Sequence, residues 1–152
     1  MVKNDIAAGD VGFDGVAAES LTDAGITGAD ISWDYTVNGV SLGLGYSTQT
    51  ENMTYSIGMS FSGVDLTVAG AAFDNDDSDF RVKAATSFGP LSAAVLFTET
   101  ETAGTTVNAS AINVGYAVND ALSVAAAFAQ SDATGDPDSS GVGFTYNLGG
   151  GL

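Results

Sequence analysis

The feature that most constrains this chain is a two-residue alternation between apolar and small polar side chains over residues 31–62. In the run ISWDYTV, Ile31, Trp33 and Tyr35 share one face, and the residues between them are polar. The alternation resumes after the Asn-Gly pair at 38–39 and again after a second polar stretch. A period of two indicates β-strands whose two faces meet different surroundings. Asn-Gly between two such runs predicts a tight hairpin.

The face opposite the apolar side chains is unusual because it carries Gly, Ser, Thr and Ala and almost no charge. In a soluble β-sandwich the polar face meets bulk water, and we would expect Lys, Glu and Arg on it. A continuous apolar and aromatic face combined with a small-residue face is typical of a transmembrane β-barrel. In such a barrel lipid lies outside and a hydrated lumen lies inside.

Composition excludes several classes of protein and of site. The 152 residues suffice for one domain. The absence of Cys and His excludes disulfide scaffolds, Cys- or His-ligated metal sites and a Ser-His-Asp triad. With 19 acidic and 3 basic residues, the net charge of -16 leaves no basic patch for nucleic acid. The hydrophobic content of 45% and the regular alternation argue against disorder.

The same alternation predicts nine strands. They are expected at residues 31–37, 40–48, 52–62, 64–74, 79–88, 91–99, 107–118, 121–130 and 140–148. Short connections are expected at 38–39, 62–63, 89–90, 119–120 and 149–151, and longer ones at 48–52, 74–79, 99–106 and 131–139. Short turns on one side and long loops on the other are typical of outer-membrane barrels. We therefore expect an all-β, antiparallel up-and-down transmembrane β-barrel, of which these strands form one part.

Aromatic residues and acids sort by position along the expected strands. The aromatic residues near the short turns are Phe61, Phe88, Tyr116 and Tyr146, and those near the long loops are Tyr46, Tyr55, Phe80, Phe97 and Phe128. Two such rings of aromatics predict girdles at the two lipid–water interfaces. The acids gather in the long connections, which predicts one negatively charged rim. Residues 1–30 do not alternate, and we expect a long loop with a short helical piece there.

Three segments of the chain resemble the general porins of Gram-negative outer membranes, most closely the alphaproteobacterial, Rhodobacter-like type. They are GDVGFDGVAAESL at 9–21, ISWDYTVNGVSLGLGYS at 31–47 and SGVGFTYNLGGGL at 140–152. The resemblance implies that the first is the constriction loop, which folds into the pore. It also implies a homotrimer of barrels with about 16 strands each. The start of the chain has no apolar signal-peptide segment. We therefore expect a C-terminal fragment that lacks the first strands and the last two.

Charged residues on the small-residue face are the candidate functional residues. By resemblance, the acids of the constriction loop are Asp10, Asp14, Glu19 and Asp23. Arg81 and Lys83 share a face with the small residues of their strand, and a charge on the lipid face would cost about 2–4 kcal/mol. We therefore expect both in the lumen, together with Asp34 and Asp65. The alternative is that Arg81 and Lys83 merely balance acids near Asp77 and Asp79.

Calcium is a second possibility that the acidic loops raise. The segment DNDDSD offers Asp74, Asp76, Asp77 and Asp79 over six positions, and Ca²⁺ takes oxygen ligands. The EF-hand order of ligands is absent, so a solvated acidic loop is the alternative. Paired carboxylates could also serve a glycosidase, but they lie in loops without an aromatic cleft. We expect no enzymatic activity and no resident cofactor.

Two functions from different classes remain. The first is an outer-membrane porin that passes small hydrophilic solutes and ions passively and favours cations, with membrane lipid as its surroundings. The second is a secreted, soluble, acidic β-domain that acts as a surface or Ca²⁺-binding interaction module. The apolar face discriminates them, because a soluble domain buries that face and a barrel exposes it to lipid.

Overall fold

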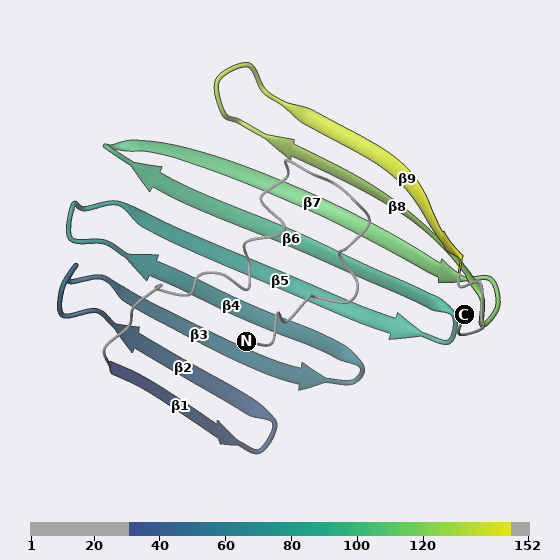
Figure 1. Cartoon of the computed structure of the whole chain (residues 1–152), viewed down its shortest axis with the longest axis horizontal. Coiled ribbons are helices and arrows are strands. Elements are labelled where there is room, and N and C mark those ends of the chain that lie inside the picture. Colours follow the sequence, from purple (N-terminus) through teal and green to yellow (C-terminus); the bar gives the residue numbers. More distant parts are fainter. Residues whose placement is uncertain (1–30, 147–152) are drawn as a thin grey trace, which may run out of the picture.

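The computed structural model describes residues 31–146, which form a single antiparallel sheet of nine strands (Figure 1). The strands are β1 (Ile31–Val37), β2 (Val40–Tyr46), β3 (Met53–Phe61), β4 (Val64–Ala72), β5 (Ser78–Phe88), β6 (Leu91–Thr102), β7 (Thr105–Ala117), β8 (Leu122–Ser131) and β9 (Asp138–Tyr146). Their order in the sheet is their order in the sequence, so the chain is an up-and-down meander. The predicted all-β, antiparallel fold is confirmed.

One predicted loop is wrong. The segment 99–106, expected as a long loop, instead continues β6 to Thr102 and begins β7 at Thr105. The connection is the pair Ala103-Gly104, with positive φ at both residues, as two-residue hairpins of the primed type require. Threonine alternates with glutamate in the last residues of β6, and β-branched threonine is well suited to a strand.

Register keeps unlike side chains on opposite faces of the sheet. Trp33 pairs with Leu44, which in turn pairs with Tyr55, and all three lie on what we call the apolar face. The opposite face, which carries Asp34 and Lys83, is called the polar face. Because side chains alternate along every strand, a shift of one residue in the pairing of a strand would move all its apolar side chains to the polar face. The antiparallel pairing therefore preserves one apolar face across all nine strands.

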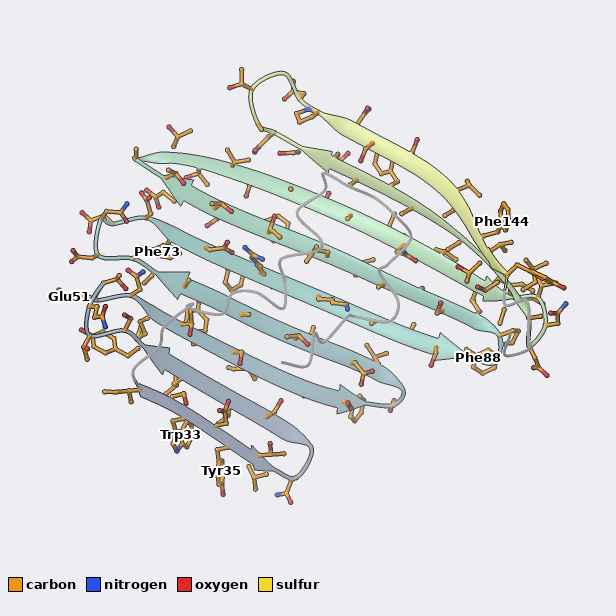
Figure 2. The ribbon with its side chains drawn as sticks, in the orientation of Figure 1. Trp33, Tyr35, Glu51, Phe73, Phe88 and Phe144 are labelled. Carbon is orange, nitrogen blue, oxygen red and sulfur yellow. The ribbon has the colours of Figure 1, made fainter. Side chains whose placement is uncertain are left out.

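The described sheet has no apolar core of its own. Its buried apolar residues are Ala69, Ala71 and Ala129, which are all small. Large side chains of the apolar face are exposed, among them Trp33 at 48%, Phe88 at 85% and Phe144 at 77% (Figure 2). Such a face is stable only against an apolar phase or another layer of protein. No helix within residues 31–146 is long and apolar enough to cross a membrane.

The two ends of the strands differ in their connections. At one edge, which we call the turn edge, β1–β2, β3–β4 and β5–β6 are joined by two-residue turns. At the other, the loop edge, lie the longer connections 47–52, 73–77 and 132–137. Figure 2 shows Glu51 and Phe73 at the loop edge and Phe88 at the turn edge. β1 and β9 flank the described sheet and run in the same direction, because the strands alternate.

Glycines let neighbouring side chains lie flat on the sheet. A Cβ atom added to Gly43 would lie 2.5 Å from the Ser56 hydroxyl oxygen on the next strand. On the apolar face, the ring of Tyr55 covers Gly70, where a Cβ atom would lie 2.5 Å from the ring carbon Cζ. A glycine covered by a cross-strand aromatic ring is a known means of fixing register. At both positions a larger residue would collide with the neighbouring side chain, so packing and not backbone conformation alone calls for glycine.

Candidate functional site on the polar face and the loop edge

The polar face is lined mainly by hydroxyls and small side chains. In the described strands its charged residues are Asp34, Asp65, Asp79, Arg81 and Lys83. One row of paired residues crosses the sheet from Asp34 through Gly43, Ser56 and Ala69 to Arg81. The small residues of this row separate its acidic end from its basic end.

Arg81 is held by a carboxylate of its own strand. Its Nε donates a hydrogen bond of 2.6 Å to Asp79 Oδ1, and its Nη2 bonds Asp79 Oδ2. The two side chains are only 12% and 14% exposed. Bidentate pairing of a guanidinium with a carboxylate is strong and fixes both groups in place. For Arg81, the structure therefore shows the charge balance with Asp79 that the sequence left open.

Lys83 lies two residues further along β5, at the midpoint of that strand. Its partners in register are Thr67 on β4 and Leu96 on β6, so neither is acidic. Asp65 is close enough for its charge to act on the ammonium, and its carboxylate accepts a hydrogen bond from the Ser60 hydroxyl. Within residues 31–146, Lys83 makes no ion pair.

Asp34 is the acid of the polar face on β1. Its Oδ1 leans over Gly43, where an added Cβ atom would lie 3.3 Å from it. Asp34 and Asp65 thus lie on the same face as Arg81 and Lys83, on three different strands. The constriction-loop candidates Asp10, Asp14, Glu19 and Asp23, like the predicted loop and helix of residues 1–30, lie outside the described residues.

The loop edge carries most of the described acids. They are Glu51, Asp74, Asp76, Asp77, Asp79, Glu99, Glu101, Asp132, Asp136 and Asp138. Among the turn-edge connections within residues 31–146, only the one between β7 and β8 contains an acid, Asp120. The sheet is therefore electrically asymmetric along its strands, with a negative loop edge.

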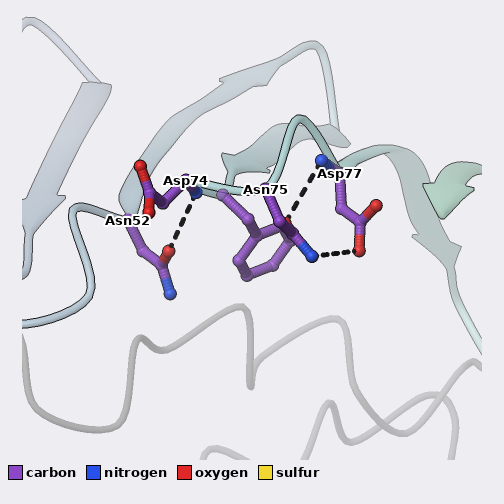
Figure 3. A pocket seen from close by; sticks show the side chains of 5 residues that line it. Asn52, Asp74, Asn75 and Asp77 are labelled. Carbon is purple, nitrogen blue, oxygen red and sulfur yellow. Dashed lines mark hydrogen bonds between the residues drawn. The ribbon is translucent and has the colours of Figure 1, made fainter. Parts of the chain in front are cut away.

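Side-chain hydrogen bonds tie the connections of the loop edge together (Figure 3). Asn52 Oδ1 accepts a bond of 3.4 Å from the backbone N–H of Asp74, which joins the β2–β3 and β4–β5 connections. Asp77 Oδ2 accepts from Asn75 Nδ2 at 2.8 Å, and Asp77 Oδ1 accepts from the N–H of Ala103 at 2.8 Å. Asp77 therefore links the β4–β5 connection to the β6–β7 turn.

A second link lies between β7 and the β8–β9 connection. The backbone N–H of Asn108 donates to Asp132 Oδ1 at 2.6 Å, and its side-chain Nδ2 donates to Oδ2 at 2.9 Å. These two bonds stabilise the charged carboxylate, so they hold the pKa of Asp132 below its ordinary value. The N–H of Asp132 in turn donates to the carbonyl oxygen of Asn108 at 3.0 Å.

Two of the calcium candidates, Asp77 and Asp79, already form hydrogen bonds with different partners. Asp77 serves the backbone and side-chain donors just described, and Asp79 binds Arg81. A hollow of about 320 Å³ is lined by Asn52, Phe73, Asp74, Asn75 and Asp77 (Figure 3). In the part of the chain that the structure describes, no three acidic side chains converge in a way that could hold a metal ion. Calcium binding by Asp74, Asp76, Asp77 and Asp79 stays a prediction.

The comparison with protein families decides the affiliation of the chain. Residues 2–152 match the family of Gram-negative porins. The chain belongs to this family. The predicted affiliation and the predicted location in the outer membrane are thereby confirmed, whereas the alphaproteobacterial type stays a prediction. No curated protein matches the sequence.

Solved structures support the same fold. The porin sheet is similar to outer-membrane expressed OmpT of Vibrio cholerae, with a TM-score of 0.53 and 17% identity over 78% of this chain and 49% of that one. It is also similar to the loop L8 deletion mutant of OmpT, with a TM-score of 0.52 and 18% identity over 78% of this chain and 52% of the other. The chain spans about half the length of these outer-membrane proteins.

Proposed function

We propose that this porin contributes the wall of a water-filled channel through which small hydrophilic solutes and ions diffuse passively, without covalent chemistry. The observation that carries the proposal is the separation of the two faces of the sheet. Large apolar side chains are exposed on one face, and hydroxyls and small residues line the other. In a barrel wall the first face meets lipid and the second meets water.

The charge of the loop edge supports a preference for cations. A mouth lined by acids raises the local concentration of cations and lowers that of anions. This effect falls within about 10 Å at 0.1 M salt. The preference is therefore expected to be larger in dilute salt than in concentrated salt.

The charged residues of the polar face are proposed to line the lumen. Arg81, Lys83, Asp34 and Asp65 lie on the face that a barrel turns inward. Asp10, Asp14, Glu19 and Asp23 are proposed as the facing acids of a constriction loop, and the assembly is proposed to be a homotrimer, both by resemblance to general porins. Charges on opposite sides of a constriction select ions by the field between them.

The test is the conductance of the full-length protein in a planar lipid bilayer. We expect an ohmic conductance, with a reversal potential under a KCl gradient that shows K⁺ passing more easily than Cl⁻. The variant Asp76→Asn/Glu101→Gln, which neutralises two acids of the loop edge, should reduce this preference. The variant Arg81→Gln/Lys83→Gln should increase it. A protein that does not conduct would refute the channel, and a preference for Cl⁻ would refute the role of the acids.

A further inference from the structure

We propose that the two basic residues of the polar face are not equivalent, and that Lys83 sets the ion selectivity of the wall while the charge of Arg81 is cancelled by Asp79. This inference rests on the proposed channel and names the group within it that selects ions. It predicts that the channel retains some tolerance of small anions, such as chloride and small carboxylates, despite its acidic loop edge.

The geometry of Arg81 supports the first half of the proposal. Its guanidinium contacts both oxygens of Asp79, which lies two residues away on the same face of the same strand. Both side chains are largely withdrawn from solvent. An ion in the lumen therefore meets a cation and an anion in contact, whose fields oppose each other. The pair contributes shape to the wall and little net field.

The surroundings of Lys83 support the second half. Its neighbours in register, Thr67 and Leu96, carry no charge, and Lys83 makes no ion pair within the described residues. The nearest acid known to act on it is Asp65, which pairs in register with Ala85 and is therefore displaced along the strand. The Lys83 ammonium thus presents, at the midpoint of β5, a positive charge that no described residue holds in an ion pair.

The expected size of the effect follows from Coulomb attraction. A single charge about 8 Å from a passing ion in water-like surroundings changes the local concentration of that ion about two- to threefold. Loss of the Lys83 charge should raise the local concentration of K⁺ and lower that of Cl⁻ by this factor each, so the permeability ratio of K⁺ to Cl⁻ should rise about four- to ninefold in dilute salt. Removal of both members of the Arg81–Asp79 pair should leave the ratio nearly unchanged.

The experiment compares variants of the full-length protein in planar bilayers at low salt, with KCl as the probe. Lys83→Gln should raise the permeability ratio, and Lys83→Arg, which keeps the charge, should retain the value of the unmodified protein. Asp79→Asn/Arg81→Gln keeps the net charge and serves as the matched control. Thr67→Asp leaves Lys83 in place and puts a carboxylate opposite it in register, so it should shift the ratio in the same direction as Lys83→Gln.

The outcomes separate this inference from the proposed function. If the unmodified protein conducts but Lys83→Gln and Thr67→Asp leave the ratio unchanged, the inference is wrong and the channel stands. The inference is also wrong if Asp79→Asn/Arg81→Gln shifts the ratio as far as Lys83→Gln does. If the unmodified protein inserts into the bilayer without conducting, the channel and the inference fall together.

Discussion

An arginine substituted on one face of β6 should affect stability differently from one on the other face, because one face meets lipid and the other meets water. Val95 lies on the apolar face, is 49% exposed, and pairs with Ala84, the midpoint between Phe80 and Phe88. With a rise of about 3.4 Å per residue, Ala84 is about 14 Å along the strand from each ring. A strand tilt of about 40° makes the apolar band about 21 Å tall, close to the usual 25 Å. Val95 is therefore near the middle of the membrane.

The variant Val95→Arg is expected to destabilise the folded protein by about 2–4 kcal/mol, the cost of arginine at the bilayer midplane. Its neighbour Ala94 lies on the polar face, so Ala94→Arg, the matched control, should cost less than about 1 kcal/mol because the guanidinium stays in water. The measurement is urea-dependent folding of the full-length protein into lipid vesicles, followed by tryptophan fluorescence. Equal destabilisation by the two variants, or a larger loss for Ala94→Arg, would refute the assignment of the faces.

Three further predictions concern local contacts. Gly43→Ala should cost about 1 kcal/mol by crowding the Ser56 hydroxyl, and the double variant with Ser56→Ala should recover most of it in the same folding assay. The folded protein lowers the pKa of Asp132, so the link from Asp132 to Asn108 should stabilise the fold fully above the ordinary pKa near 3.8 and lose this effect as the pH falls through the lowered pKa. In a pH series of the folding assay, Asn108→Ala should abolish this part of the pH dependence. Asp77→Ala should speed amide hydrogen exchange in the β6–β7 turn and leave the strands unchanged, and an unaltered turn would contradict the link.

Most of the fold could be predicted from alternation alone. The nine strands, their order and their two faces follow from a period of two and from turn signals such as Asn38-Gly39. The exception is the β6–β7 hairpin, where the sequence predicts a long, acidic loop over residues 99–106 and the structure has a two-residue turn. Charged side chains do not prevent a strand from forming where they lie in water, and alternating threonines favour strand formation. Beyond the apolar band, acidity is thus a poor guide to where a strand ends.

The candidate site could be predicted only in part. Parity along β5 predicted that Arg81 and Lys83 share a face, but it did not distinguish the paired arginine from the unpaired lysine. The distinction depends on side-chain conformation at Asp79, which alternation does not specify. The loop links were missed because their partners are far apart in sequence, by 26 residues for Asp77 and Ala103 and by 24 for Asn108 and Asp132. No local motif signals such pairs.

The common direction of β1 and β9 restricts how this wall can be closed. An antiparallel barrel needs every neighbouring pair of strands to run in opposite directions, which requires an even total. A strand that pairs with the free edge of β1 must run against it, and the same holds at β9. The rest of the wall is therefore an odd number of strands that begins and ends in the opposite direction. A second copy of the nine-stranded sheet in the same orientation would instead create parallel seams.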